Sequence, residues 1–503
     1  MDRTEPSHLE GTTATAARVS PPLDRVLSPA RPAANTLARA LDDAGFTRAQ
    51  FWALMIILAG MFFDTLEQNS VGAMGSLLKS SLHIGNNGLT TINSFTVIGG
   101  LIGRFLGGWI ADRYGRRTSL SLNLLVYTLG GLLSAVALNY PVLLGSRLIV
   151  GIGLGGEFTI GIAMLCEMVA TRHRGTLVAT LNIGSGGVGN FLSYGLFLLL
   201  LGPLAPALGG DALVWRWTFV LLSLPALIVV LYRRRLPETP RFLLSQGRVE
   251  EANHSLARLT GDRLGGRGRP VRPAPPVLSE ADIPARQLKA SPAAVFDSSV
   301  RSRTLTIGTA SWMAFGAQVT LNFLMPTLLT ERGYTLSDSL LYTMIMNVGS
   351  LLGACASALL AGRRGRRSVI GVAGSLGCLT AVAFAVFAHQ TAAILVIGAL
   401  FQFFTMLTNT TLAVWSPELY PTPVRASGTS IVNGIGNVAG AVMPFAAVAL
   451  YDRFSFAGVF GMVAVMYAVL VVVSRFAPET RNRTLEEVNE ATAPTTDPVP
   501  VAT

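Results

Sequence analysis

Residues 108–117, GWIADRYGRR, place Asp112 and three arginines between two apolar segments. The chain becomes apolar again soon after Arg117. Half of the 503 residues are hydrophobic and only 13% are charged, whereas soluble domains typically carry about 25% charged residues. Segments of the roughly 20 apolar residues that a bilayer requires recur along the whole chain. The composition therefore predicts an integral membrane protein.

Twelve apolar segments can be distinguished along the chain. Each is expected to be a helix, because in lipid every backbone polar group must be satisfied within its own segment. The predicted fold class is an all-α membrane protein with twelve transmembrane helices. The segments are residues 51–78, 88–110, 119–138, 142–164, 177–201, 212–232, 304–329, 340–361, 368–388, 391–414, 427–450 and 456–476.

Charge distribution predicts the orientation of these helices. With both ends of the chain on one side, that side holds 19 lysines and arginines and the other side 4, leaving out the long central loop. Cytoplasmic loops carry such an excess, so we expect a multi-pass inner-membrane protein with cytoplasmic termini. The expected parts are a disordered tail (1–50), two six-helix bundles (51–232 and 304–476), a linker (233–303) and a second tail (477–503).

The sequence contains no recognisable catalytic, metal-binding or nucleotide-binding motif. The first part of the linker favours short amphipathic helices, and its second part has a disordered composition. No nucleophile–base pair, no metal-ligand spacing and no GxxxxGK[ST] loop occurs. The basic residues follow the membrane segments, so nucleic acid is not an expected partner. We expect a monomer that is not an enzyme and has no metal and no cofactor.

An internal repeat relates the two halves. Residues 101–103 (LIG) return as 351–353 (LLG), and residues 115–117 (GRR) return as 365–367. Glu167 and Arg174 return as Glu418 and Arg425, and residues 237–239 (PET) return as 478–480. Parallel repeats of this kind are typical of transporters, so two homologous six-helix bundles are expected.

The 108–117 stretch resembles the signature between helices 2 and 3 of the major facilitator superfamily. The PETPRF, PELYPTPVR and PET motifs resemble its sugar-porter branch, which includes aromatic-acid and niacin-type proton symporters. The resemblance implies a latch that closes the cytoplasmic side, in which Asp112 meets a helix end of the other half and the arginines pair with carboxylates such as Glu167. Gly362 stands where the second copy would need the acid, so a second latch is expected to be degraded. The latch residues implied are Gly108, Asp112, Arg113, Gly115, Arg116, Arg117, Glu167, Arg174, Glu418 and Arg425. The alternative is that the arginines only fix the topology.

Helix 1 contains the acidic residues best placed for proton coupling. Asp64, Glu67 and Gln68 fall within one sector of the helix, and Asp64 lies about 18 Å along the axis from Trp52. A carboxylate near the bilayer centre can hold or release a proton as its surroundings change. The Asp-x-x-Glu pattern resembles helix 1 of the aromatic-acid symporters, with Thr65 in place of a glycine and Glu67 in place of a second aspartate. The alternative is a structural carboxylate bonded to helix 4 or 5.

Helix 4 adds Arg147 and Glu157. Arg147 either neutralises Asp64, attracts an anion, or extends to the outer interface. Glu157 either takes part in transport or forms a buried ion pair. An ionisable residue within the bilayer usually faces a cavity or a partner.

The second half carries amides at helical spacing instead of charges. Such stripes line a substrate cavity or act as hydrogen-bonding contacts between helices. With helix 5, the candidate cavity residues are Gln68, Asn182, Asn190, Gln318, Asn322, Gln402, Asn409 and Asn433.

These features favour a secondary active transporter that uses the proton gradient to carry a small organic solute by alternating access. An aromatic or other monocarboxylate is favoured by helix 1. A sugar or polyol is favoured by the PETPRF and PELYPTPVR motifs and by the amides. The same features leave open a drug-type exporter and, more remotely, a non-transporting sensor that keeps the fold.

Overall fold

The computed structural model describes residues 34–233, 236–261, 277–283, 295–360, 363–387, 390–420 and 424–480. Every regular element among these residues is a helix, which confirms the expected fold class. Ten of the described helices are long and apolar enough to cross a membrane. One of the ten contains two predicted spans, and Ser298–Glu331, a further helix outside the ten that carries Gln318 and Asn322, corresponds to the twelfth predicted span.

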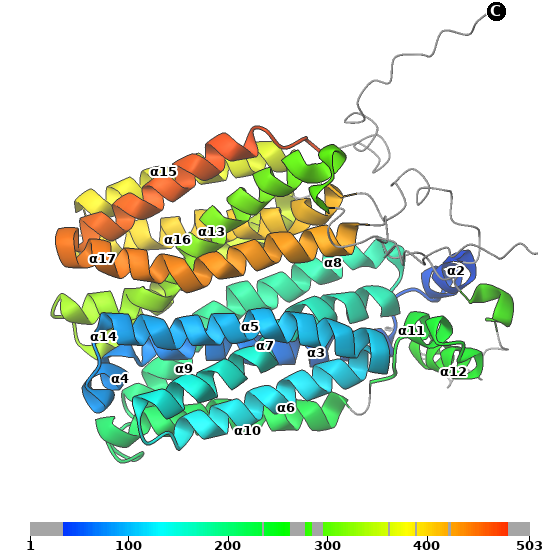
Figure 1. Ribbon diagram of the computed structural model, residues 1–503, viewed down its shortest axis with the longest axis horizontal. Coiled ribbons are helices and arrows are strands. Elements are labelled where there is room, and N and C mark those ends of the chain that lie inside the picture. The colour runs from blue at the N-terminus through cyan, green and yellow to red at the C-terminus, as the bar shows by residue number, and fades with distance from the viewer. Residues whose placement is uncertain are drawn as a thin grey trace, which may run out of the picture.

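The first bundle is built from the helices that pack around the N-terminal membrane segment (Figure 1). A seven-residue π-helix, Ile183–Gly189 (IGSGGVG), joins α8 to α9. Such wide turns often accompany functional sites, and this one separates Asn182 from Asn190. The helices are α3 (Arg48–Ala73), α4 (Gly75–Leu82), α5 (Asn86–Tyr114), α6 (Arg116–Ala135), α7 (Tyr140–Met168), α8 (Thr171–Asn182), α9 (Asn190–Leu201) and α10 (Asp211–Arg233).

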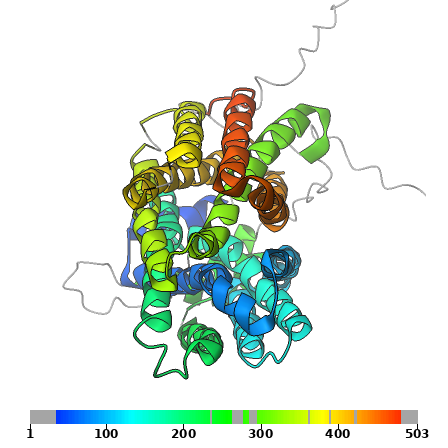
Figure 2. The same cartoon turned by 90° about the vertical axis from the view of Figure 1, so that its left-hand side faces the viewer.

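The second bundle lies beside the first, and Figure 2 shows both groups of helices along their axes. Non-helical backbone at Ser455 (φ 53°, ψ −146°) divides the last helix in two, where sequence predicted two separate spans. The helices are α13 (Ser298–Glu331), α14 (Leu336–Leu360), α15 (Arg366–Phe387), α16 (Thr391–Glu418) and α17 (Arg425–Ser474).

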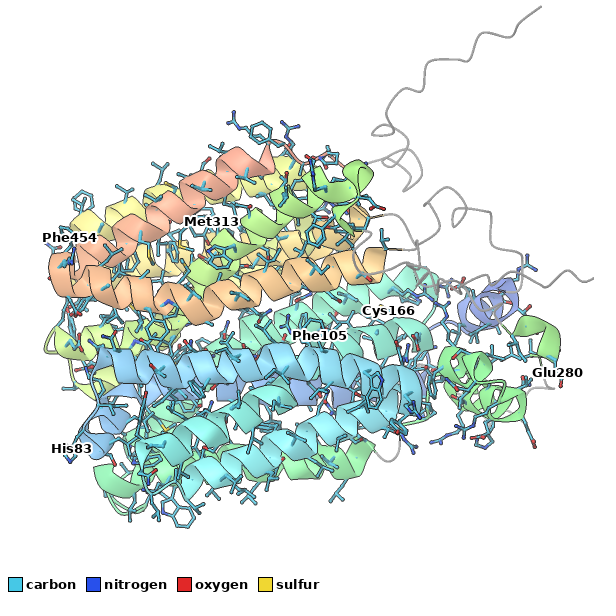
Figure 3. The ribbon with its side chains drawn as sticks, viewed as in Figure 1. His83, Phe105, Cys166, Glu280, Met313 and Phe454 are labelled. Carbon is cyan, nitrogen blue, oxygen red and sulfur yellow. The ribbon has the colours of Figure 1, made fainter. Side chains whose placement is uncertain are left out.

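We call the two ends of the molecule the basic end and the opposite end. The basic end holds the turns at Gly115 and Gly365 and the linker helices, and Glu280 marks it in Figure 3. The opposite end holds the turn at Ser455, and His83 and Phe454 mark it in the same view.

The extramembrane part is more ordered than expected. Within the predicted disordered tail, Ala34–Ala44 forms α2, so that prediction is wrong for this segment. The reason is burial: Leu37 and Leu41 pack in one apolar cluster with Phe242 of the linker. Residues 1–33 lie outside the described residues.

The helix boundaries also differ slightly from the predicted parts. α3 begins at Arg48 because Thr47 and Gln50 form a reciprocal N-terminal cap. The first part of the linker does form short helices, α11 (Pro240–Ser245) and α12 (Val249–Thr260), followed by the turn η2 (Glu280–Asp282). The linker segments predicted to be disordered, 262–276 and 284–294, lie outside the described residues, as do residues 481–503 of the second tail.

The repeat is visible in the helix packing. A Cβ atom at Gly103 would collide with the carbonyl oxygen of Ile152, and one at Gly353 would collide with that of Phe403. Both glycines therefore allow α5 to approach α7, and α14 to approach α16, with backbones in contact. The glycines differ by 250 residues and their partners by 251, so the same contact is made in each half.

Candidate functional site

A cavity of about 310 Å³ lies between the two bundles. It is lined by α3, α5, α7 and the α8–α9 junction from the first bundle, and by α13, α16 and α17 from the second. Most of its polar lining consists of amides. The lining Asp, Arg, Asn and Gln residues are Asp64, Gln68, Asn69, Asn93, Arg104, Arg147, Asn182, Asn190, Gln318, Asn322, Asn409, Asn433 and Asn437.

Asp64 is the one carboxylate among the described residues that lines this cavity. It lies on α3, about 24 Å along the axis from the start of that helix. The side chain is 6% exposed, and its Oδ1 atom has no hydrogen-bond partner. It forms no ion pair with an arginine of the described chain.

Glu67 lies behind the cavity wall and pairs with Arg147. Both side chains are fully buried. The Arg147 guanidinium also donates from Nε to Thr96 Oγ1 (3.3 Å) and lies 5.1 Å from the centre of the Phe219 ring. These contacts exclude the alternative in which Arg147 extends to the interface, and its partner is Glu67 rather than Asp64.

Glu157 forms the buried ion pair that was one of its two expected roles. Its partner is Arg233, which donates from Nη1 to Glu157 Oε2 (3.0 Å) and from Nη2 to Oε1. The pair occupies the space beside Gly60, where a side chain would collide with both groups. Gly60 precedes Asp64 by four residues, so the ion pair lies one helical turn from Asp64.

The predicted amides come together, with one exception. Gln68, Asn182, Asn190, Gln318, Asn322, Asn409 and Asn433 all line the cavity. Gln402 does not; it lies behind Asn322 and donates from Nε2 to Asn322 Oδ1 (2.6 Å). Asn190 accepts from Asn69 Nδ2 (2.9 Å), so some of these amides bond to one another, as expected of hydrogen-bonding contacts between helices.

Arg104 is the charged lining residue that was not predicted from the sequence, and the amides Asn69 and Asn93 were not predicted either. Arg104 lies on α5 and donates from Nη2 to Asn437 Oδ1 of α17 (3.2 Å), which joins the two bundles across the cavity. Helical side chains lean toward the N-terminus, so its guanidinium lies nearer the bundle centre than its Cα. The sequence contained one signal for Arg104, because an arginine within a predicted membrane span usually faces a cavity or a partner.

The two bundles are joined at the opposite end. Lys79 of α4 pairs with Glu331 of α13 (2.6 Å). Ser94 donates to the carbonyl oxygen of Ala441 (2.6 Å), and Tyr194 donates to that of Asn322 (2.7 Å). The cavity extends toward the basic end, because two of its lining residues, Ile307 and Ser416, lie on that side.

The repeated motifs form a first charge cluster at the basic end: Arg116, Glu167, Glu238 and Thr239. Arg116 pairs with Glu167 (3.5 Å), and Thr239 donates to the same carboxylate (2.6 Å). Glu238 accepts from the backbone amide of Arg116 (3.0 Å) and so caps the start of α6. Burial raises the pKa of the Glu238 carboxyl above its ordinary value, and these amide donors oppose that rise.

The second charge cluster, Arg366, Glu418, Glu479 and Thr480, repeats this arrangement. Arg366 pairs with Glu418 (3.0 Å), Thr480 donates to Glu418 (2.5 Å), and Glu479 accepts from the backbone amide of Arg366 (2.9 Å). These contacts are therefore kept in the second half. The expectation that a second latch is degraded rests on Gly362 in place of the acid, so it stays a prediction. Gly362 lies outside the described residues.

The other residues expected to form a latch also lie at or near the basic end. Asp112 is half-exposed and pairs with Arg116 of its own bundle (3.1 Å). The Arg113 guanidinium lies over the rings of Trp109 and Tyr114. Arg174 forms no ion pair with Glu167. Arg117 donates to the carbonyl oxygen of Leu236 (3.2 Å). A Cβ atom at Gly108 would meet no atom within 4 Å. Arg425 is the first residue of α17, and its side chain is not among those described.

The sequence profile of the family described as "Sugar (and other) transporter" matches residues 52–492. The chain is 27% identical over 455 residues to the niacin transporter NiaP of Acinetobacter baylyi, covering 90% of this chain and 99% of that protein. It is 28% identical over 409 residues to the gallate transporter of Pseudomonas putida, covering 79% and 84%. The inward-open structure of the xylose transporter XylE from E. coli aligns with a TM-score of 0.67 at 17% identity, covering 88% of this chain and 100% of that one.

Proposed function

This chain belongs to the sugar (and other) transporter family, and from that premise we propose that it carries a small aromatic carboxylate together with a proton. It is a membrane transporter and not an enzyme, as its family and relatives are. Transport in this fold proceeds by rocking of two bundles about a central site. The observation that carries the proposal is Asp64, a cavity carboxylate without an arginine of its own.

Charge pairing supports Asp64 as the proton site. Among the described residues, the interior of the first bundle holds three carboxylates and three arginines; Glu67 and Glu157 each pair with one arginine, and the third arginine, Arg104, forms no ion pair with Asp64. A buried charge without a partner is costly, so a proton is the natural counter-charge for Asp64 when water is excluded. Opening the cavity to water on either side allows that proton to leave, which couples proton movement to the rocking motion.

The relatives and the cavity support the substrate class. Niacin and gallate are both aromatic rings that carry one carboxylate, and their transporters are named above. A cavity of about 310 Å³ lies at the lower end of the range for small-molecule sites. Phe158, Phe315 and Phe323 line it together with the amides, which offers apolar contact to a ring and hydrogen bonds to its substituents.

The charge distribution supports a cytoplasmic location for the basic end. The 19-to-4 excess of basic residues lies on that side, so the described state would be open inward and closed outward. The protein would then act as a monomer in the inner membrane, with the proton gradient as its energy source and no cofactor. We propose that the latch at Asp112 acts when the cytoplasmic side closes.

Proteoliposomes with an internal pH dye test the proposal. Nicotinate, benzoate, glucose and xylose are supplied in turn under an inward proton gradient. We expect one of the carboxylates to accumulate with internal acidification. Asp64→Asn is expected to bind and exchange that solute without moving protons, whereas Asp452→Asn, which removes an exposed carboxylate at the opposite end, is expected to behave as the native protein.

The same assay identifies the main alternative. If glucose or xylose accumulates and neither aromatic acid does, the sugar-porter interpretation, which the amide-rich lining favours, replaces this one. If an acid accumulates with acidification in Asp64→Asn as well, Asp64 is a structural carboxylate and the proton is bound elsewhere.

A further inference from the structure

Three arginines reach the interior from membrane helices of the first bundle, and they differ in their partners. Arg147 pairs with Glu67 and Arg233 pairs with Glu157, and all four side chains are almost completely buried. Arg104 forms no ion pair with any carboxylate of the described residues, and its Nε atom is buried without a hydrogen-bond partner. It is therefore the one of the three whose positive charge the protein leaves without a counter-charge.

An uncompensated cation at this depth is unusual. Ionisable residues within membrane helices normally pair with one another or face a cavity. Arg104 lines the cavity, and its one direct partner is a neutral amide oxygen, that of Asn437 (3.2 Å). A fixed arginine beside a water-accessible cavity attracts an anion, and its planar donors match a carboxylate in two-point geometry.

The surroundings leave room for such an anion. Gly100 and Gly108 lie four residues on either side of Arg104, so these two neighbouring positions on α5 carry no side chain. Gly100 lines the cavity, and a Cβ added at Gly108 would meet no atom within 4 Å. Phe158 and Phe315 also line the cavity and supply apolar surface.

We propose that Arg104, with Asn437 beside it, forms the subsite that binds the carboxylate of the transported solute. This inference rests on the proposed function and names the group that recognises its substrate. The anion takes the donors of Arg104 that the protein leaves unused, and the Asn437 side chain orients the guanidinium. Because Arg104 belongs to the first bundle and Asn437 to the second, a bound carboxylate lies where the two bundles meet.

Binding of matched acids and amides tests the subsite. Isothermal calorimetry on the purified full-length protein compares nicotinate with nicotinamide and benzoate with benzamide. The native protein is expected to prefer the acid. In Arg104→Gln the acid is expected to bind about 10–100-fold more weakly, the loss associated with a charge-assisted hydrogen bond, while the affinity for the amide stays the same.

Two further variants make the result decisive. Asn437→Asp places a carboxylate beside Arg104 and supplies the missing counter-charge, so it is expected to fold and to lose the same preference for the acid. Arg453→Gln removes an exposed arginine at the opposite end by the same substitution and is expected to keep the preference.

The outcomes separate this inference from the proposed function. If an acid is carried with protons but both Arg104→Gln and Asn437→Asp bind it as the native protein does, the subsite is elsewhere and the proposed function stands. If the native protein neither binds nor carries either acid, the proposed function and this inference are both overturned.

Discussion

The interior of the first bundle holds two arginine–glutamate pairs, Asp64 and Arg104, whereas the cavity lining of the second consists of apolar side chains, amides and hydroxyls. α13 has no charged residue between Thr304 and Thr330. In that bundle Gln402 donates to Asn322 (2.6 Å), and Tyr467 donates to Thr405 (2.8 Å). At the basic end, by contrast, the two charge clusters match contact for contact. The repeat has kept its ends alike while its interiors have diverged.

The repeat offsets show how one ion pair was replaced. An offset of 251 residues takes Glu157 to Thr408, and an offset of 241 takes Arg233 to Ser474. Both hydroxyl residues are fully buried. By these offsets, two neutral residues stand at the positions where the first bundle has an ion pair. The comparison indicates that the fold does not require an ion pair at the position of Glu157 and Arg233. The carboxylate and the arginines that line the cavity all belong to the first bundle.

The largest expected effect comes from breaking the Glu157–Arg233 pair. Arg233→Ser leaves a buried carboxylate without a partner, and removing one member of a buried pair costs about 3–5 kcal/mol of unfolding free energy. The double variant Glu157→Thr with Arg233→Ser copies the second bundle and is expected to recover most of that loss. Chemical unfolding in detergent measures both changes.

The exposed Arg453→Ser is the control for the first prediction, with an expected change within about 0.5 kcal/mol. A double variant that unfolds as easily as the single one would show that the first bundle, unlike the second, depends on this charge pair for its packing.

The next largest effect compares the glycines of the two charge clusters. Gly115 has φ +103° and ψ 158°, a region that is essentially restricted to glycine, whereas Gly365 has no positive φ. In both, a Cβ would collide with a carboxylate, that of Glu238 or Glu479. Gly115→Ala therefore carries an additional backbone strain of about 1–3 kcal/mol and is expected to melt at a lower temperature than Gly365→Ala. Equal melting temperatures would mean that the collision alone sets the cost.

The sequence predicted the helices, the repeat and most of the cavity amides, because these depend on patterns within one helix. It missed Arg233, which lies one residue beyond the predicted span. Its partner Glu157 is 76 residues away, and no local spacing indicates that contact. Arg104 was missed for a related reason: an arginine in an apolar span is recognisable, but whether a carboxylate lies beside it depends on how the helices of both bundles assemble.

The sequence indicated that Glu238 and Glu479 have the same role but did not indicate what that role is. The PET motif returns at an offset of 241 residues, so a shared structural role was indicated, but its contact with the GRR motif was not. That contact forms only when the end of α10 approaches the start of α6. Long-range contacts of this kind are the part of the site that a single sequence leaves undetermined.

A smaller effect tests whether the two charge clusters are equivalent. Glu238→Ala and Glu479→Ala each remove the acceptor that caps a helix start, a loss of about 0.5–2 kcal/mol. Because the capping distances match, at 3.0 and 2.9 Å, the two variants are expected to lower the unfolding free energy by similar amounts. Unfolding in detergent measures both, and a clear inequality would mean that Asp112, present in the first half alone, adds to the first cluster.

The smallest expected effect lies where the bundles meet at the opposite end. Lys79 and Glu331 are each 24% exposed, and ion pairs of this kind contribute about 0.2–1 kcal/mol. Lys79→Gln destabilises the conformation in which the opposite end is closed. The conformation in which that end is open therefore becomes about 1.4- to 5-fold more populated. A solute supplied from that side binds only the open state, and its apparent Kd is expected to fall by the same factor. Binding to right-side-out vesicles measures this fall in the apparent Kd.

Two variants control for the charge of the pair. Lys79→Arg keeps the charge and is expected to leave the Kd unchanged, and the exchange Lys79→Glu with Glu331→Lys is expected to restore the native Kd. If the exchange leaves the Kd lowered, the pair does not hold the bundles together, and the backbone contacts of Ser94 and Tyr194 close this end by themselves.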